Sequence, residues 1–273
     1  MASNELFTIP IPGTEAHPGG AIVCTTPAPQ VYLLTWSSPT DNRLTPAFNT
    51  ALMTALDAIE FGQAPGVVVT TSAIAKFYSN GLDLQLALST PGFLETSLYP
   101  LFRRLLTYPM PTVALLNGHA FAGGIMLAMH HDYRVFGAAK GYACVNELEF
   151  GVPLTPPMSA IFRLKLAPAA YRELVLEARR YGARDALAAG LVDAVGDGLP
   201  AALELIRARG LAAKGTSGVY GLLKAEMYRE SIALLDGPSA NPAETRDVEV
   251  KRKAAGAKRY KEWKNAQVTG AKL

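Results

Sequence analysis

A glycine-rich stretch offers the residue types that could bind an anion in this chain of 273 residues. Residues 113–116 form a short apolar run that predicts a buried strand. Gly123 and Gly124 then precede the apolar residues 125–129, which predict a buried helix. A helix start presents backbone N–H groups that lack internal partners, and a glycine there lets a ligand approach the amide closely. Alternatively, these glycines serve only to let the helix pack closely on a neighbouring element.

A second glycine turn favours the anion-binding interpretation. Residues 66–71 predict a β-strand, and residues 77–84 then lead past Gly81 into a helical pattern. The chain therefore has two separate turns that each place a backbone amide beside a glycine. Two amides that converge on one oxygen form an oxyanion hole.

These turns belong to a series of motifs that resembles the crotonase, or enoyl-CoA hydratase/isomerase, superfamily. The resemblance covers roughly residues 28 to 196, with several motifs in the same order. The motifs are Ser79–Leu84, Asn117–Ala120 with Gly123-Gly124, Asn146-Glu147 with Gly151, Pro111–Ala114 and Ala186–Val192.

The resemblance implies a role for both turns. The backbone amides of Leu82 and Gly123 would hold the thioester oxygen of an acyl-CoA while it becomes an enolate. The residues expected to contact the substrate or its CoA part are Ser79, Asn80, Gly81, Asp83, Gly124 and Met126.

The carboxylates around such a site decide which reaction it supports. In hydratases of this family two glutamates act through water, and the first lies three residues after the oxyanion glycine. Met126 occupies that position here and cannot exchange a proton. The second glutamate opens a loop four residues before a glycine, and here it is Glu147, before Gly151. One glutamate and one apolar residue resemble the Δ3,Δ2-enoyl-CoA isomerases, which need a single base to move a proton from C2 to C4.

Burial would suit Glu147 to this task as the catalytic base. An apolar pocket raises the pKa of a carboxyl group toward the range useful for proton transfer. Exclusion of water, which Met126 favours, lets the same proton return to the substrate. Glu149 is a rival base, and a surface loop is the commoner place for any glutamate. In one branch of peroxisomal isomerases the base comes from a later element, but residues 152–161 contain no Asp or Glu.

The motif His130-His131-Asp132 does not predict a metal site. Neighbouring helix residues point about 100° apart, so the two imidazoles do not easily chelate one ion. The other histidines are His17 and His119, and we assign no catalytic role to His119. The sequence also lacks a G-x-S-x-G elbow, a P-loop and a G-x-G-x-x-G fingerprint. We therefore expect no metal and no cofactor, coenzyme A being part of the substrate.

The elements that must position these groups alternate between strand and helix. Residues 1–30 predict a loose leader that pairs into a sheet edge, and residues 31–36 predict a strand. Thr45 and Pro46 predict the start of a helix that runs to about Glu60. This alternation indicates an α/β class. The resemblance implies a crotonase-like spiral of repeated β-β-α units, which periodicity alone does not distinguish from a doubly wound sheet.

The alternation of strands and helices gives way to a purely helical pattern beyond about residue 197. This change predicts two regions, a spiral core over residues 1–196 and a C-terminal helical region over residues 197–273. Helices are expected over 201–209, 219–235 and 244–263. The resemblance implies that this region makes contacts in a homotrimer or hexamer and closes the CoA site. The basic residues 251–264 fit a solvated helix face, a contact to the CoA 3′-phosphate, or an RNA-binding role, for which the interleaved aromatic residues are few.

Composition narrows the class of protein. A hydrophobic content of 49% with 18% charged residues is typical of a globular chain, and a net charge of +3 does not call for nucleic acid. Two unpaired cysteines, Cys24 and Cys144, suit a reducing compartment. We expect a soluble intracellular protein without a secretory signal or a membrane span.

The last three residues, Ala271-Lys272-Leu273, resemble the Ser-Lys-Leu type of peroxisomal address, which an import receptor reads. The combined prediction is a peroxisomal Δ3,Δ2-enoyl-CoA isomerase of fatty-acid β-oxidation. The alternatives are an enoyl-CoA hydratase or another enolate-forming crotonase, and a non-catalytic or RNA-binding homologue.

Overall fold

The computed structural model describes residues 4–137, 140–237 and 250–258. It divides the chain into two compact units, Met1–Gly237 and Pro238–Leu273. In the second unit residues 250–258 are helical, within the helix predicted for 244–263. The rest of that prediction and the tripeptide at 271–273 lie outside the described residues. The site described below belongs to the first unit.

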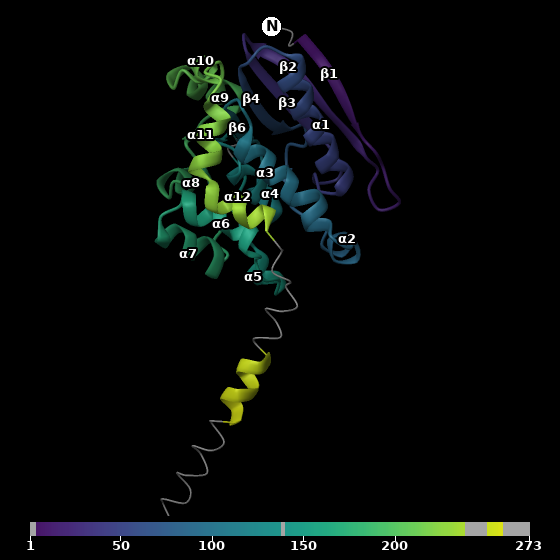
Figure 1. Ribbon diagram of the computed structural model, residues 1–273, viewed down its shortest axis with the longest axis vertical. Coiled ribbons are helices and arrows are strands. Elements are labelled where there is room, and N and C mark those ends of the chain that lie inside the picture. Colours follow the sequence, from purple (N-terminus) through teal and green to yellow (C-terminus); the bar gives the residue numbers. More distant parts are fainter. Residues whose placement is uncertain (1–3, 138–139, 238–249, 259–273) are drawn as a thin grey trace, which may run out of the picture. The chain divides into compact units, whose positions relative to one another are not determined.

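A seven-stranded sheet forms the frame of the first unit (Figure 1). Its first three strands are antiparallel, so the predicted leader is an edge hairpin, and the strands from β3 onward are parallel. In spatial order the strands are β1 (Asn4–Ile11), β2 (Gly20–Ala28), β3 (Val31–Ser37), β4 (Val67–Ser72), β6 (Thr112–Leu116), β8 (Tyr133–Phe136) and β10 (Ala194–Val195).

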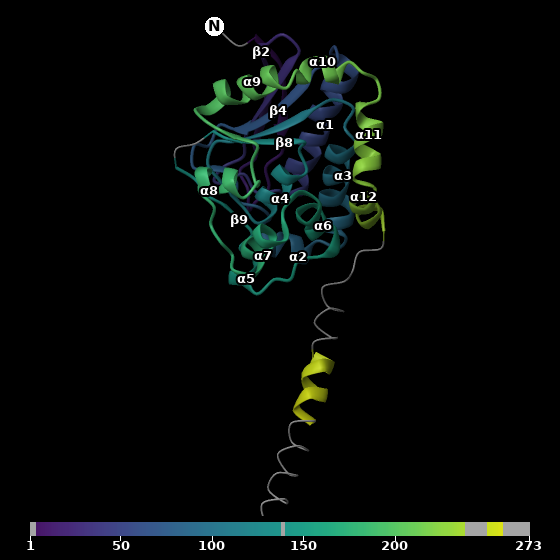
Figure 2. The same ribbon diagram turned by 90° about the vertical axis from the view of Figure 1, so that its left-hand side faces the viewer.

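The central strands are buried on both faces, which explains their continuous apolar runs. Every residue of β4 and β6 is buried. Val68 and Ala114 belong to the main core, while Val67, Val69 and Val113 belong to a second core on the other face. Figure 2 shows α9 (Gly198–Ala208) along one face of the sheet and α4 (Gly123–Met129) on the other.

A second, three-stranded parallel sheet gives the fold its repeat. It contains β5 (Phe77–Ser79), β7 (His119–Phe121) and β9 (Ala143–Cys144) in that order. Each follows a strand of the large sheet and precedes a helix, namely α2 (Leu84–Ser89), α4 or α5 (Glu147–Phe150). This is the predicted spiral of β-β-α units, and the α/β class is confirmed.

The first long helix, α1 (Pro46–Gly62), begins as predicted. The Thr45 side chain accepts a hydrogen bond from the backbone N–H of Phe48, and Pro46 occupies the first turn. The helix buries the predicted apolar face against the main core, through Phe48, Leu52, Leu56 and Ile59.

The helices after residue 196 pack on the same unit, whose limit is residue 237. The helix α9 contacts β6, β8 and β10, and α12 contacts α3 and α6. The predicted helix over 219–235 is interrupted at Tyr228 and forms α11 and α12. The remaining helices are the π-helix η1 (Leu94–Leu98), α3 (Tyr99–Thr107), α6 (Pro156–Lys165), α7 (Pro168–Leu176), α8 (Ala183–Ala188), α10 (Leu211–Gly215), α11 (Tyr220–Met227) and α12 (Arg229–Asp236).

Among the described residues, no helix combines the length and the hydropathy needed to cross a lipid bilayer.

Candidate active site

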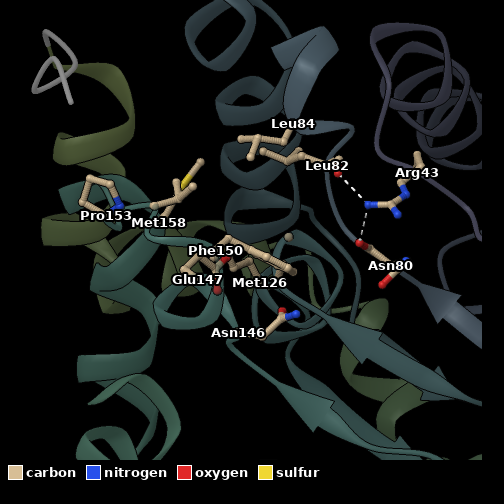
Figure 3. Close-up of a pocket in the computed structure, with 13 residues that line it drawn as sticks. Arg43, Asn80, Leu82, Leu84, Met126, Asn146, Glu147, Phe150, Pro153 and Met158 are labelled. Atoms are coloured by element: carbon tan, nitrogen blue, oxygen red, sulfur yellow. Dashed lines mark hydrogen bonds between the residues drawn. The ribbon is translucent and has the colours of Figure 1, made fainter. Parts of the chain in front are cut away.

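Three loops meet at one edge of the small sheet. Because β5, β7 and β9 are parallel neighbours, their carboxyl ends lie at the same edge, where the chain continues into residues 80–83, 122–123 and 145–147. The loops border a cavity of about 280 Å³ (Figure 3). Its lining consists of Arg43, Asn80, Leu82, Leu84, Ala122, Gly123, Met126, Asn146, Glu147, Phe150, Val152, Pro153 and Met158.

The two glycine turns touch each other. Gly81 has a positive φ of 79°, and a Cβ atom built on it would lie 2.8 Å from the amide nitrogen of Gly123. Ala122 adopts a φ of 49° just before α4, which is uncommon for a residue with a side chain. Within the described residues, the N–H groups of Leu82 and Gly123 donate to no acceptor. Two unpaired amides on adjoining turns can bind one oxygen anion.

Arg43 fixes the first of these turns. Its Nη1 donates to the carbonyl oxygens of Asn80 at 3.1 Å and Leu82 at 2.8 Å, and its Nε donates to Asp41 at 2.9 Å. Arg43 was not predicted as a site residue from the sequence. Its partners on the turn lie 37 and 39 residues away, so no local spacing points to the contact.

Glu147 opens α5 and faces the cavity. Its Oε2 atom is buried and has no hydrogen-bond partner in the described part of the chain. Burial, which removes the water that would solvate the charge, raises the pKa of Glu147 to about 7. The carboxyl group can therefore exchange a proton near neutral pH.

The rival carboxylate Glu149 has different surroundings. It is exposed, pairs with Arg180 at 3.2 Å and does not line the cavity. Among the described residues of the lining, Glu147 is the only acid.

Apolar side chains form much of the remaining wall. Met126, at 1% exposure, lies in α4 one turn after Gly123. Phe150 and Met158 come from α5 and α6, after the last loop. Such a wall disfavours water beside Glu147 and can accept a hydrocarbon chain.

Two of the predicted contact residues, Ser79 and Gly124, hold the turns in place and do not line the cavity. Ser79 is buried, and its hydroxyl donates to the carbonyl of Asn42 at 2.7 Å. A Cβ atom on Gly124 would lie 2.2 Å from the carbonyl oxygen of Ser79. For Gly124 the packing alternative therefore holds, since this glycine lets α4 lie against β5.

Asp83 and Gly81 also lie outside the lining. Asp83 caps α2, accepting from the N–H of Leu86 at 3.0 Å, and meets His17 Nε2 at 2.9 Å. Of the predicted residues, Asn80, Leu82, Gly123, Met126 and Glu147 line the cavity.

His130 and His131 are buried in the protein core. Their Nδ1 atoms face the carbonyls of Met126 and Leu127, and because a carbonyl only accepts, Nδ1 carries the proton in each ring. Burial lowers the pKa of both side chains to about 3, so they are neutral. In the described ranges no three His, Cys, Asp or Glu residues are grouped to hold a metal ion.

Comparisons with a protein-family model and with known proteins agree on one family. Residues 28–231 match the family model described as enoyl-CoA hydratase/isomerase. Enoyl-CoA delta isomerase 3 of Arabidopsis thaliana is 32% identical over 225 residues, covering 78% of this chain and 94% of that protein. The peroxisomal enoyl-CoA delta isomerase 2 of the same plant is 32% identical over 220 residues, covering 75% and 91%.

Solved structures agree with this result. The apo structure of an enoyl-CoA isomerase from Mycobacterium tuberculosis has a TM-score of 0.67 at 26% identity, covering 78% of this chain and 93% of that one. An enoyl-CoA hydratase from Mycobacterium marinum has a TM-score of 0.65 at 26% identity, covering 78% and 94%. With this fold and this matched stretch, the chain belongs to the enoyl-CoA hydratase/isomerase, or crotonase, family of enzymes.

Proposed function

We propose that this enzyme is a Δ3,Δ2-enoyl-CoA isomerase of fatty-acid β-oxidation. The observation that carries the proposal is the pairing of one carboxylate, Glu147, whose Oε2 atom is buried and unpaired, with an apolar Met126 beside two unpaired amides. Such a site can move a proton, but its lining, as far as the structure describes it, offers no second acid with which to add water. The Arabidopsis relatives named as enoyl-CoA delta isomerases support the same reaction.

In the proposed reaction each of these groups has one role. The thioester oxygen of a 3-enoyl-CoA accepts hydrogen bonds from the N–H groups of Leu82 and Gly123, and Glu147 removes a proton from C2. The electron pair delocalises over C2, C3, C4 and the thioester oxygen as a dienolate, whose charge the two amides stabilise by several kcal/mol. Glu147 then returns the proton to C4, leaving the double bond between C2 and C3. No cofactor takes part, since coenzyme A belongs to the substrate.

A direct assay tests the proposal. Purified protein is incubated with a 3-enoyl-CoA, and the conjugated 2-enoyl-CoA is followed by its ultraviolet absorbance. We expect turnover by the wild-type protein. A separate incubation with the 2-enoyl-CoA measures water addition by loss of the same absorbance. Hydration without isomerisation would establish the hydratase alternative and refute the proposal.

We also propose a peroxisomal location and assembly into a homotrimer or hexamer. The support for the location is the terminal Ala271-Lys272-Leu273, a sequence of the type read by an import receptor, together with relatives named as peroxisomal. Sedimentation of the full chain measures the assembly.

A further inference from the structure

Asn146 occupies a helix-capping position but does not cap. It directly precedes α5, where an asparagine side chain normally accepts a hydrogen bond from the first turn. Here the side chain makes no such bond, and the backbone adopts a φ of −100° and a ψ of 21°, in the sparsely populated region where many active-site residues lie. The local sequence therefore does not explain the orientation of this carboxamide.

The carboxamide oxygen of the same side chain is buried and unpaired. Asn146 is 8% exposed and lines the cavity, and its Oδ1 has no hydrogen-bond partner in the part of the chain that the structure describes. A buried polar atom left unpaired costs about 1–3 kcal/mol. A side chain that keeps such an atom at the cavity wall is suited to a ligand that supplies the partner.

The cavity places Asn146 between a polar and an apolar end. In Figure 3, Asn80 and Arg43 lie on one side of Asn146, and Pro153 and Met158 lie on the other, beyond Glu147. A hydrocarbon chain favours the apolar end. The sulfur side of a thioester bound at the oxyanion amides then points toward the polar end, and Asn146 lies in the cavity wall between the two ends.

The chemistry of that departing arm matches a carboxamide. In an acyl-CoA the sulfur is followed by two methylene groups and then by a secondary amide, which offers one N–H donor and one carbonyl acceptor. A carboxamide side chain offers the complementary acceptor and donors. We propose that Asn146 hydrogen-bonds this first amide of the CoA arm and thereby sets C2 of the substrate against Glu147. This inference rests on the proposed isomerase function.

The test combines removal of the amide from the substrate with removal of the carboxamide at position 146 of the protein. The N-acetylcysteamine thioester of a 3-enoyl acid carries the amide, and the S-pentyl thioester of the same acid replaces it with methylene groups. For the wild type we expect kcat/KM to be about tenfold higher for the amide-bearing thioester, as one neutral hydrogen bond allows. In Asn146→Leu this ratio should fall to near one, because the side chain no longer recognises the amide.

A purely structural role gives a different result. If Asn146→Leu lowers kcat/KM for both thioesters by the same factor, so that the ratio stays at its wild-type value, the assignment is wrong. Asn146→Ala makes the same comparison with a smaller side chain should the leucine variant not fold. Asn4→Leu, at the exposed start of β1, is the matched control and should keep the wild-type ratio.

The outcomes also separate this inference from the proposed function. If the wild type isomerises neither thioester nor a 3-enoyl-CoA, the isomerase proposal fails, and the inference fails with it. If the wild type isomerises both thioesters with no preference for the amide, the isomerase proposal stands and the Asn146 assignment alone is refuted.

Discussion

A single nitrogen of Arg43 donates to the carbonyl of Leu82 at 2.8 Å and to that of Asn80 at 3.1 Å. These carbonyls flank the Leu82 N–H on both sides along the chain. The guanidinium thus fixes the direction of an amide that it does not itself contact, and its salt bridge to Asp41 at 2.9 Å holds the guanidinium in turn. Arg43 is therefore a positioning residue for the proposed oxyanion site.

Substitution of Arg43 should therefore reduce turnover more than stability. Loss of a complete oxyanion donor costs about 10²–10³ in kcat, so a donor that is merely misdirected should cost about tenfold. We expect this loss of kcat in Arg43→Ala, with a melting temperature within a few degrees of the wild type. The control is Arg103→Ala, which removes an exposed ion pair with Asp236 and should keep full activity. Full activity in Arg43→Ala would contradict the positioning role.

Substitution of Glu147 and of Glu149 should have very different effects on kcat. Glu147→Gln keeps the side-chain shape but cannot shuttle a proton, so we expect kcat to fall by about 10³ or more while acyl-CoA affinity stays nearly intact. Glu149→Gln removes only the exposed pair with Arg180 and should be mild. Steady-state kinetics and acyl-CoA binding measure both effects. Reversed phenotypes would show that the base had been assigned to the wrong glutamate.

The raised pKa of Glu147 predicts the pH dependence of activity. The base must be deprotonated in the free enzyme, so kcat/KM should increase as pH rises through about 7 and then level off. The cause is desolvation, so a variant that lets water in should move this midpoint down. Met126→Ser adds a hydroxyl and space beside the site, and its pH profile should have a lower midpoint. An unchanged profile would argue against the dry wall as the source of the shift.

The same shift predicts how stability depends on pH. The folded-state pKa of about 7 lies above the reference value of 4.5, so the folded protein binds the proton more tightly than the unfolded chain does. The free energy of unfolding should therefore fall as pH rises from about 4.5 to 7. Glu147→Gln should be more stable than the wild type at pH 8 by about 1–2 kcal/mol, after allowance for its partial exposure. At pH 4.5 urea unfolding should show no such gain.

Gly123 and Gly124 should respond differently to substitution. A Cβ atom on Gly123 would meet its neighbours at 3.4 Å, an ordinary contact, so Gly123→Ala should fold. The branched chain of Gly123→Val would crowd the thioester and redirect the amide, and should abolish activity in a folded protein. Gly124→Ala places its Cβ 2.2 Å from the carbonyl oxygen of Ser79 and should destabilise the fold by several kcal/mol. Thermal unfolding and turnover of the three variants separate the two roles.

The terminal tripeptide can be tested by truncation. Full-length chain and a chain without Ala271-Lys272-Leu273, each with a fluorescent tag at the N-terminus, are compared in cells. We expect the full chain in peroxisomes and the truncated chain in the cytosol, with the same isomerase activity in both. Identical distributions would refute the targeting proposal.

The sequence predicted most of what depends on local pattern. The helix beginning at Thr45, the strands around residues 31–36 and 113–116, and the glycine turns at Leu82 and Gly123 each have a signal within a few residues. The structure places both turns at one cavity with Glu147, as the motifs indicated.

The parts that the sequence did not reveal depend on distant contacts. The strands β5 and β9 have three and two residues, too few for a periodic pattern. The hydrogen bonds from Arg43 to the carbonyls of Asn80 and Leu82 join positions almost forty residues apart in the chain. Gly124 was predicted as a ligand-contacting glycine, and only the 2.2 Å approach of a Cβ built on it to the Ser79 carbonyl oxygen shows its packing role.

The small sheet has a consequence for how this family can diversify. Its carboxyl edge carries the groups that we propose to bind the anion as backbone amides on the loops after β5 and β7, and the group that we propose to transfer the proton as a side chain on the loop after β9. Backbone amides persist whatever side chains surround them, provided the turns keep their shape. An exchange at position 126 or 147 can therefore change the fate of the enolate while the apparatus that forms it is inherited intact. A change of reaction on this scaffold therefore does not by itself require the fold to be rebuilt.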